Sequence, residues 1–213
     1  MDALVNNAGY ALTGPFEIST DEQIRREFEV NVFGIFNTTR TFLKHFRENR
    51  KGTIVNIGSM AGKTTLPLIS TYNSSKFAVE GFTESLSYEL SSLDIKVKLV
   101  EPGSMTTDCT GRSMDYAQSE TITDYEGFSK KFLEAAMNEN GQLTSPPVIV
   151  AEVIHEAVTD NTDTLRYIAG EDAKQMISLR EANGDEAYVQ MIKEKLFGLV
   201  IPHAYFRSTG KPY

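Results

Sequence analysis

Three apolar segments separated by long helical patterns constrain the fold of this chain more than any other feature. The segments at 2–7 (DALVNN), 52–58 (GTIVNIG) and 95–103 (IKVKLVEPG) are almost continuously apolar, as expected of strands covered on both faces. Between them, apolar residues recur with helical spacing over 20–47 and 71–92. Strands that alternate with helices of this length predict an α/β fold with a parallel sheet and right-handed crossovers.

The remaining segments give weaker signals. Residues 8–19 are punctuated by Gly and Pro and are expected to form a loop. Residues 104–145 have no regular pattern beyond short helical stretches. A helix starting at Pro is expected over 146–160, then a short strand over 165–170 and one or two helices over 171–198.

Composition excludes several classes of function. The formal net charge is −8 and the pI is about 5.0, which disfavours nucleic acid and anionic membrane surfaces as partners. A single cysteine, Cys109, rules out an intramolecular disulfide framework and fits a reducing cytoplasm. No apolar run approaches the roughly 20 residues that a membrane span needs. The three histidines, His45, His155 and His203, lack the spacing of metal ligands, so no metal is expected.

The carboxyl ends of the three apolar segments carry small and polar residues. The first ends in NNAG, the second in GSMAG and the third in EPGSMTT. Ligands of open parallel sheets bind outside the carboxyl ends of the strands, and glycine lets a backbone approach a ligand closely. One such loop could serve only a tight turn, but three at the same edge predict a binding site.

The helix over 71–92 carries a candidate acid/base pair. Tyr72 and Lys76 are four residues apart, so they share one helical face, and the cation would lower the pKa of the phenol. A Tyr–Lys pair of no function on a helix surface is the commoner reason for this spacing. Ser59, at the end of the preceding strand, favours a site because its hydroxyl could bond the same substrate oxygen. Asn31 is a buried-looking amide whose simplest role is local hydrogen bonding.

The ordered motifs NNAG, NVFG, GSMAG, YNSSK and PGSMTT resemble those of the short-chain dehydrogenase/reductases. The resemblance is close from Asp2 to about Thr110. It is looser to about Gly198, where RYIAGEDA resembles hydroxysteroid and retinol dehydrogenase-like members. It implies a Rossmann-like, doubly wound parallel sheet. It also implies an oxidoreductase that transfers hydride between NAD or NADP and a lipophilic or medium-sized secondary alcohol or ketone.

The same resemblance implies a role for each matching residue. Tyr72 is the catalytic acid/base, Lys76 lowers its pKa and holds the nicotinamide ribose, and Ser59 orients the substrate oxygen. Asn31 holds a water that links Lys76 to solvent. The residues implied in cofactor binding are Tyr72, Lys76, Asn6, Asn7, Ala8 and Gly9 on the adenosine side, and Pro102, Gly103 and Thr107 at the nicotinamide carboxamide.

The resemblance also implies roles for longer segments of the chain. Residues 104–145 are the substrate lid within a domain over 1–198, and 199–213 form a C-terminal tail. The helices over 20–47 and 71–92 pair with a partner subunit in a four-helix bundle, or else only cover one face of the sheet.

The sequence departs from the family pattern at its N-terminus. Members begin with a strand and a TGxxxGxG loop that holds the cofactor pyrophosphate, whereas Gly-x-x-x-Gly-x-Gly does not occur in this sequence. Met1 therefore falls where a member would be mid-domain, with about four of seven strands retained, and the segment at 2–7 is expected to form a sheet edge. Cofactor affinity is expected to be reduced, and the residue that selects NAD or NADP is not readable.

Three hypotheses follow from these observations. The first is an active oxidoreductase of the short-chain dehydrogenase/reductase type with Tyr72 as the acid/base. The second is an inactive truncated fragment of such an enzyme. The third is a non-catalytic protein that oligomerises through its two long helices.

Overall fold

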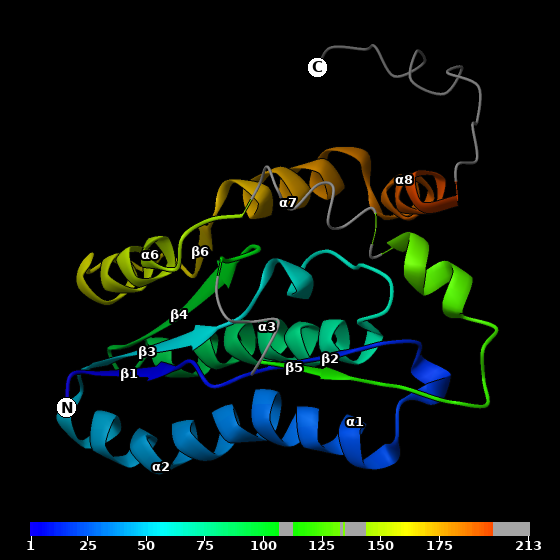
Figure 1. Ribbon diagram of the computed structural model, residues 1–213. Helices are drawn as coiled ribbons and strands as arrows, with labels where there is room; N and C mark the ends of the chain where they lie inside the picture. Colours follow the sequence, from blue (N-terminus) through cyan, green and yellow to red (C-terminus); the bar gives the residue numbers. More distant parts are fainter. Residues whose placement is uncertain (107–112, 133, 135–143, 198–213) are drawn as a thin grey trace, which may run out of the picture.

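The computed structural model describes residues 1–106, 113–132, 134 and 144–197, and Figure 1 shows their arrangement. The main sheet has four parallel strands in the order β1-β3-β4-β6, and a second sheet pairs β2 with β5. The strands are β1 (Ala3–Asn6), β2 (Ala11–Thr13), β3 (Gly52–Ile57), β4 (Ile95–Pro102), β5 (Met114–Tyr116) and β6 (Arg166–Ala169). The helices are α1 (Asp21–Phe28), α2 (Gly34–Asn49), α3 (Ser70–Ser91), α6 (Val148–Thr159), α7 (Glu171–Asn183) and α8 (Asp185–Phe197).

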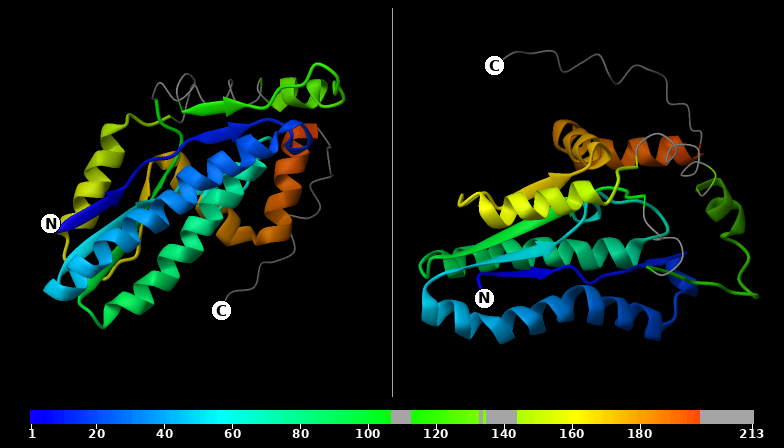
Figure 2. Two further views of the ribbon diagram at one scale, coloured as in Figure 1. Left: turned by 90° about the horizontal axis from the view of Figure 1, so that it is seen from below. Right: turned by 60° about the vertical axis from the view of Figure 1, so that its left-hand side comes forward.

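Helices cover both faces of the main sheet, which confirms the predicted α/β fold with a parallel sheet. The view from below in Figure 2 shows α2 and α3 side by side across one face. Their apolar side chains pack with Ile54, Ile95 and Val97. Helix α6 covers the other face by packing against Val55 and Val100. Because successive residues of a strand point to opposite faces, the apolar runs supply both layers of the core.

The helix predicted over 20–47 is interrupted by one π-helical turn. Helix α1 begins at a capping box, in which Thr20 and Gln23 exchange hydrogen bonds. The segment η2 (Glu29–Phe33) is π-helical, and α2 continues directly from it. Such turns within α-helices are frequent at functional sites.

The segment 8–19, expected to be a loop, contains the strand β2 and the 3-10 turn η1 (Phe16–Ile18). Strand β2 pairs in parallel with β5, which lies about 100 residues later in the chain. Each strand has only three residues, which is too short to show a period-two pattern. The prediction failed here because a distant partner, and not a local pattern, forms the strand.

The C-terminal segments follow the expected pattern. The short strand and the two helices after it are β6, α7 and α8, and the break between the helices falls at Gly184, whose φ is +80°. Part of the segment 104–145, predicted to be the substrate lid, is described, including a short helix at 126–132. The predicted tail at 199–213 lies outside the described residues. Within the described part, no helix is both long and apolar enough to cross a membrane.

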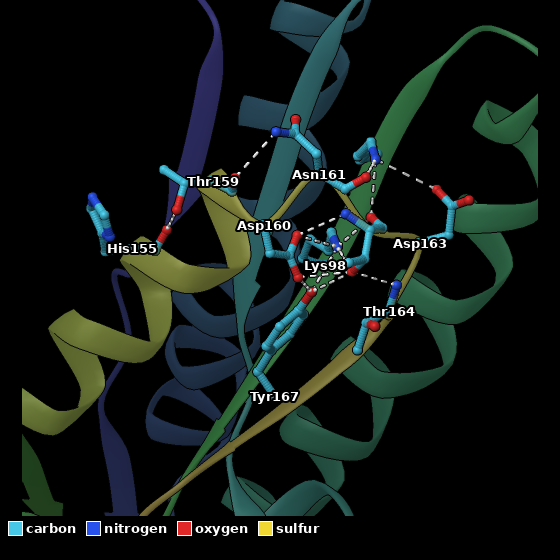
Figure 3. A network of polar contacts seen from close by, with 10 residues as sticks. Lys98, His155, Thr159, Asp160, Asn161, Asp163, Thr164 and Tyr167 are labelled. Atoms are coloured by element: carbon cyan, nitrogen blue, oxygen red, sulfur yellow. Dashed lines mark hydrogen bonds and ion pairs between the residues drawn. The ribbon is translucent and has the colours of Figure 1, made fainter.

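A polar network centred on Lys98 joins α6, β4 and β6 (Figure 3). The Lys98 ammonium is buried and donates to Thr162 O at 2.7 Å, the Tyr167 hydroxyl at 2.7 Å and Asp160 Oδ1 at 3.3 Å. The Tyr167 hydroxyl donates in turn to Asp160 Oδ2. Burial alone would raise the pKa of Asp160, but the hydrogen bonds from Tyr167, Thr162 and Lys98 lower it. The network thus fixes the turn between α6 and β6.

Candidate active site

A cleft of about 760 Å³ opens at the carboxyl ends of β1, β3 and β4. This is the edge where the sequence predicts a binding site. The cleft wall is largely apolar, with polar groups from the three strand ends. Its lining includes Asn7, Ser59, Tyr72, Pro102, Gly103, Ser104, Leu66, Ile69, Met105, Met114, Val150 and Ile154.

Tyr72 and Lys76 lie on the first turns of α3, and the predicted pairing is present. The Lys76 ammonium is 5.6 Å from the centre of the Tyr72 ring. Lys76 is 6% exposed and donates to Ile57 O at 3.0 Å. Burial lowers the pKa of Lys76 to about 8, although the negative charge of Glu27 acts in the opposite direction. A cation held in this way lies near the Tyr72 ring.

Ser59 follows β3 and shares the cleft with Tyr72. Its hydroxyl caps the 3-10 turn η3 (Met60–Gly62) by accepting from the Ala61 amide at 3.1 Å, and it donates to Pro102 O at 3.5 Å. The long second bond leaves the hydroxyl able to turn toward an oxygen in the cleft. Ser59 thus has a fixed backbone and an available donor.

Asn31 lies fully buried in the π turn and holds two segments together. Its side chain accepts from the Tyr10 amide at 3.1 Å and donates to Tyr10 O at 2.9 Å. It also donates to Ser75 Oγ at 3.1 Å, and Ser75 donates to the backbone oxygen of Tyr72 at 2.8 Å. The π turn therefore connects the NNAG loop to the helix that carries Tyr72.

The four residues of the NNAG motif have different surroundings. Asn6 is buried and donates to Asn56 Oδ1 at 2.8 Å and to Thr39 Oγ1 at 3.2 Å, so it braces the sheet against α2. Asn7 lines the cleft, and Ala8 and Gly9 are exposed. A side chain at Gly9 would approach Asn31 Oδ1 at 3.2 Å and Lys76 Nζ at 3.7 Å. Glycine keeps this space beside the Lys76 ammonium open, which fits the passage of a ligand.

Asp172, at the start of α7, fixes the loop after β4 and was not singled out from the sequence. Its Oδ2 accepts from the Ser104 amide at 2.5 Å. A Cβ at Gly103 would overlap the Asp172 carboxylate, and one at Gly170 would lie 2.7 Å from its Oδ1. The loop that contains Pro102 and Gly103 is therefore shaped around this carboxylate. Thr107, the third predicted residue of the loop, lies outside the described residues.

Glu27 is a second site residue that the sequence analysis missed. It is fully buried on α1, one turn before Asn31, and its Oε1 accepts from the Leu12 amide at 2.8 Å. Burial raises the pKa of Glu27 to about 7, against the Leu12 hydrogen bond and the Lys76 charge, which lower it. An acidic residue within an amphipathic helix gives no sign of such burial, whereas its position four residues before Asn31 could have indicated a shared face.

Two further carboxyl groups lie buried behind the Ser59 loop. Glu80 on α3 pairs with Arg166 of β6 at 3.1 Å, and a Cβ at Gly62 would lie 2.9 Å from its side chain. Glu101 on β4 is 1% exposed. Burial, followed by the neighbouring carboxyl of Glu80, raises the pKa of Glu101 to about 8. The described residues contain no group of three or more His, Cys, Asp or Glu that could hold a metal.

Comparison with known proteins identifies relatives along most of the chain. A family model described as short chain dehydrogenase matches residues 1–117. An uncharacterised oxidoreductase of Schizosaccharomyces pombe is 34% identical over 92% of this chain and 81% of its own length. The uncharacterised oxidoreductase YusZ of Bacillus subtilis is 37% identical over 92% of this chain and 71% of its own.

Solved structures show the same architecture. A short-chain dehydrogenase from Streptomyces avermitilis superposes with a TM-score of 0.73 at 28% identity, over 93% of this chain and 70% of that chain. A 3-oxoacyl-[acyl-carrier protein] reductase from Brucella melitensis, with NAD bound, gives 0.59 at 27% identity, over 80% of this chain and 62% of that chain.

Proposed function

The chain belongs to the short-chain dehydrogenase family of NAD(P)-dependent oxidoreductases, and from that membership we propose that it interconverts a secondary alcohol and a ketone with Tyr72 as the acid/base. The observation that carries the proposal is the shared cleft of Ser59 and Tyr72, with the buried Lys76 ammonium 5.6 Å from the Tyr72 ring. The alternative role, a surface Tyr–Lys pair, does not fit a lysine that is 6% exposed.

The residues around the cleft fit the nicotinamide half of the cofactor. Gly9 leaves space beside Lys76, and the loop from Pro102 to Ser104 borders the cleft. Lys76, Asn7 and this loop would hold the nicotinamide ribose and carboxamide. When bound, NAD(P) supplies the hydride acceptor or donor. The choice between NAD and NADP stays open.

Three side chains, Ser59, Tyr72 and Lys76, have separate roles in the oxidation of the alcohol. Ser59 orients the substrate hydroxyl by a hydrogen bond, and the Tyr72 phenolate accepts its proton as the carbonyl forms. Lys76 keeps its positive charge close to the phenolate oxygen and so lowers the pKa of Tyr72. In the reduction direction, Tyr72 donates the proton to the alkoxide oxygen.

The apolar lining supports a lipophilic substrate. The apolar residues of the lining include Leu66, Ile69 and Met114, together with Val150 and Ile154 of α6. Burial of apolar substrate surface contributes about 25 cal/mol per Å². We therefore propose a lipophilic or medium-sized alcohol or ketone as substrate.

The test is cofactor binding and turnover by the purified chain. We expect NADH or NADPH to bind by isothermal titration calorimetry, and a panel of lipophilic secondary alcohols to be oxidised. Tyr72→Phe should lower kcat about 10³-fold without loss of binding. A wild-type chain that binds neither cofactor would contradict the proposal.

A second candidate function is a non-catalytic protein or inactive fragment. It is favoured by one observation, the lack of Gly-x-x-x-Gly-x-Gly in the sequence. The same calorimetric titration decides between the two, because this candidate requires that neither cofactor bind.

We also propose that the two long helical segments pair with a second copy of the chain. Phe33 and Phe77 are 44% and 41% exposed on these segments, and large exposed apolar side chains are typical of interfaces. Light scattering should give the mass of an oligomer, and Phe77→Lys should shift it toward the monomer.

A further inference from the structure

Three polar side chains form a file along one face of the first helix. Gln23, Glu27 and Asn31, here called the α1 polar file, are spaced by four residues. Gln23 Nε2 donates to Asp115 Oδ1 at 3.0 Å, and Glu27 accepts from the Leu12 amide at 2.8 Å. Asn31 exchanges hydrogen bonds with Tyr10. The file therefore follows the chain from the NNAG loop through β2 toward β5.

The file leads from the buried lysine toward the surface. Asn31 and Glu27 are fully buried, whereas Gln23 is half-buried. At the inner end, the space over Gly9 is bordered by both Asn31 Oδ1 and Lys76 Nζ. The α1 polar file thus extends from the neighbourhood of Lys76 to the outer end of α1.

Unpaired oxygens accompany this path. Glu27 Oε2, the Tyr10 hydroxyl and Thr13 Oγ1 are buried and have no hydrogen-bond partner among the described residues. A buried polar oxygen without a partner costs about 1–3 kcal/mol, and ordered water or a proton commonly satisfies it. The second oxygen of Glu27 is thus placed to bind a proton or a water molecule.

We propose that Glu27 takes part in the proton transfer of the reaction: it receives the proton from Lys76 by way of water and releases it to solvent water. This inference rests on the proposed function. In alcohol oxidation, the substrate O–H bond breaks and its proton goes to Tyr72. Tyr72 returns to the phenolate when a proton passes by way of Lys76 and water to the Glu27 carboxylate, which becomes neutral. Glu27 then releases that proton to solvent water. No electrons move in these steps.

The charges around Glu27 suit this exchange. Lys76 of α3 faces it as a cation, Asp115 of β5 as an anion, and Tyr10 as a buried phenol next to Arg26. The pKa of Glu27, raised to about 7, lies close to the pKa of about 8 for Lys76. Proton exchange between groups of similar pKa meets little barrier in either direction.

The first test measures the titration of Glu27 without cofactor. A carboxyl with a raised folded-state pKa contributes stability that is complete below its unfolded pKa, about 4.5, and lost as the pH rises through about 7. Glu27→Gln removes this contribution and keeps the acceptor for Leu12. Its melting temperature should therefore gain about 5 °C on that of the wild type between pH 4.5 and 8. The exposed Glu22→Gln on the same helix should show a constant difference.

The second test measures the link to Lys76. In Lys76→Met the cation that lowers the pKa of Glu27 is gone. The upper end of the window over which Glu27→Gln gains on its parent should then move to higher pH in the Lys76→Met background, while the lower end, set by the unfolded state, stays in place. A pH-independent gap for Glu27→Gln, or a window unmoved by Lys76→Met, would overturn the proposal.

The third test uses the enzyme with cofactor. Glu27→Gln should lower kcat about tenfold with KM unchanged. Loss of the carboxylate also lowers the pKa of Lys76, so the alkaline limit of activity should shift to lower pH. A wild-type kcat and pH profile in Glu27→Gln would overturn the role in turnover. If the wild type itself shows no turnover while both stability tests succeed, the proposed function fails and the proton link between Glu27 and Lys76 stands.

Discussion

Two lysines are buried among the described residues, Lys98 on strand β4 and Lys76 on helix α3, and they are held in different ways. Lys98, 1% exposed, donates to a carboxylate, a carbonyl and a phenol. Lys76, 6% exposed, has a hydrogen bond to Ile57 O and the more distant charge of Glu27. Burial of a cation is unfavourable unless partners replace its water. The burial of the Lys98 cation is therefore fully compensated by its partners, whereas that of the Lys76 cation is compensated only in part.

The surroundings of the two lysines repeat this contrast. No atom of the Lys98 network is among the buried polar atoms without a partner in the described residues. Near the cleft, by contrast, the carboxyl groups of Glu27 and Asp172 each have one unpaired oxygen, and Glu80 and Glu101 place two carboxyl groups side by side. Unsatisfied buried groups are typical of sites where stability gives way to function. Under the proposed function, this difference separates the end of the sheet at the cleft, here called the catalytic end, from its structural end.

The largest effect is expected when the Lys76 cation is removed. Lys76→Met should reduce kcat about 10³-fold, because Tyr72 loses the cation that lowers its pKa. Its melting temperature at pH 7 should not fall, since the folded state no longer carries a poorly compensated charge. Steady-state kinetics and differential scanning calorimetry measure the two quantities. A melting temperature several degrees lower would mean that Lys76 is as well stabilised as Lys98.

The next largest effect is expected when the Lys98 cation is removed. Lys98→Met leaves Asp160 and Tyr167 without their cation and should cost about 3 kcal/mol of unfolding free energy. Urea denaturation measures this loss. Lys44→Met is the control, because the pair of Lys44 with Glu48 is exposed on both sides and contributes little. Equal losses in the two variants would count against the network.

A smaller effect is expected when the loop after β4, at the catalytic end, loses its contact with Asp172. Asp172→Ala removes the acceptor of the Ser104 amide, so the cofactor loop loses its fixed shape. We expect KM for the cofactor to rise about tenfold with kcat changed less. The adjacent and exposed Glu171→Ala should leave KM unchanged. Gly103→Ala should also raise KM, and this penalty should shrink in the double variant with Asp172→Ala, where the overlapping carboxylate is gone.

The smallest effect concerns Glu101. Its raised pKa means that its contribution to stability is complete below pH 4.5 and lost as the pH rises through about 8. Glu101→Gln should therefore gain a few degrees in melting temperature on the wild type between pH 5 and 9. The exposed Glu89→Gln on α3 serves as the control, and parallel curves for Glu101→Gln and the wild type would refute the assignment.

The sequence predicts what depends on neighbouring residues. The buried strands follow from apolar runs, and Tyr72 with Lys76 follows from helical spacing. The position of Ser59 follows from the alternation of strand and helix. The sequence did not predict what depends on distant contacts. Asp172 meets Ser104 across 68 residues, and β2 meets β5 across about 100. The burial of Glu27 also depends on such a contact, because Leu12 comes from a different element.

The π turn over Glu29–Phe33 sets the rotational phase of the helix that contains it. In an ordinary α-helix, positions four residues apart drift by about 40° per step, so Thr39 would lie about 120° from Glu27. Yet Glu27, Asn31, Ile35 and Thr39 are all buried. Because a π turn contains more residues than an α turn, it offsets this accumulated rotation and returns the later positions to the buried face. Deleting one residue there would leave a helix but turn α2 by about 100° relative to α1, so that the proton path and the apolar core could no longer both face inward.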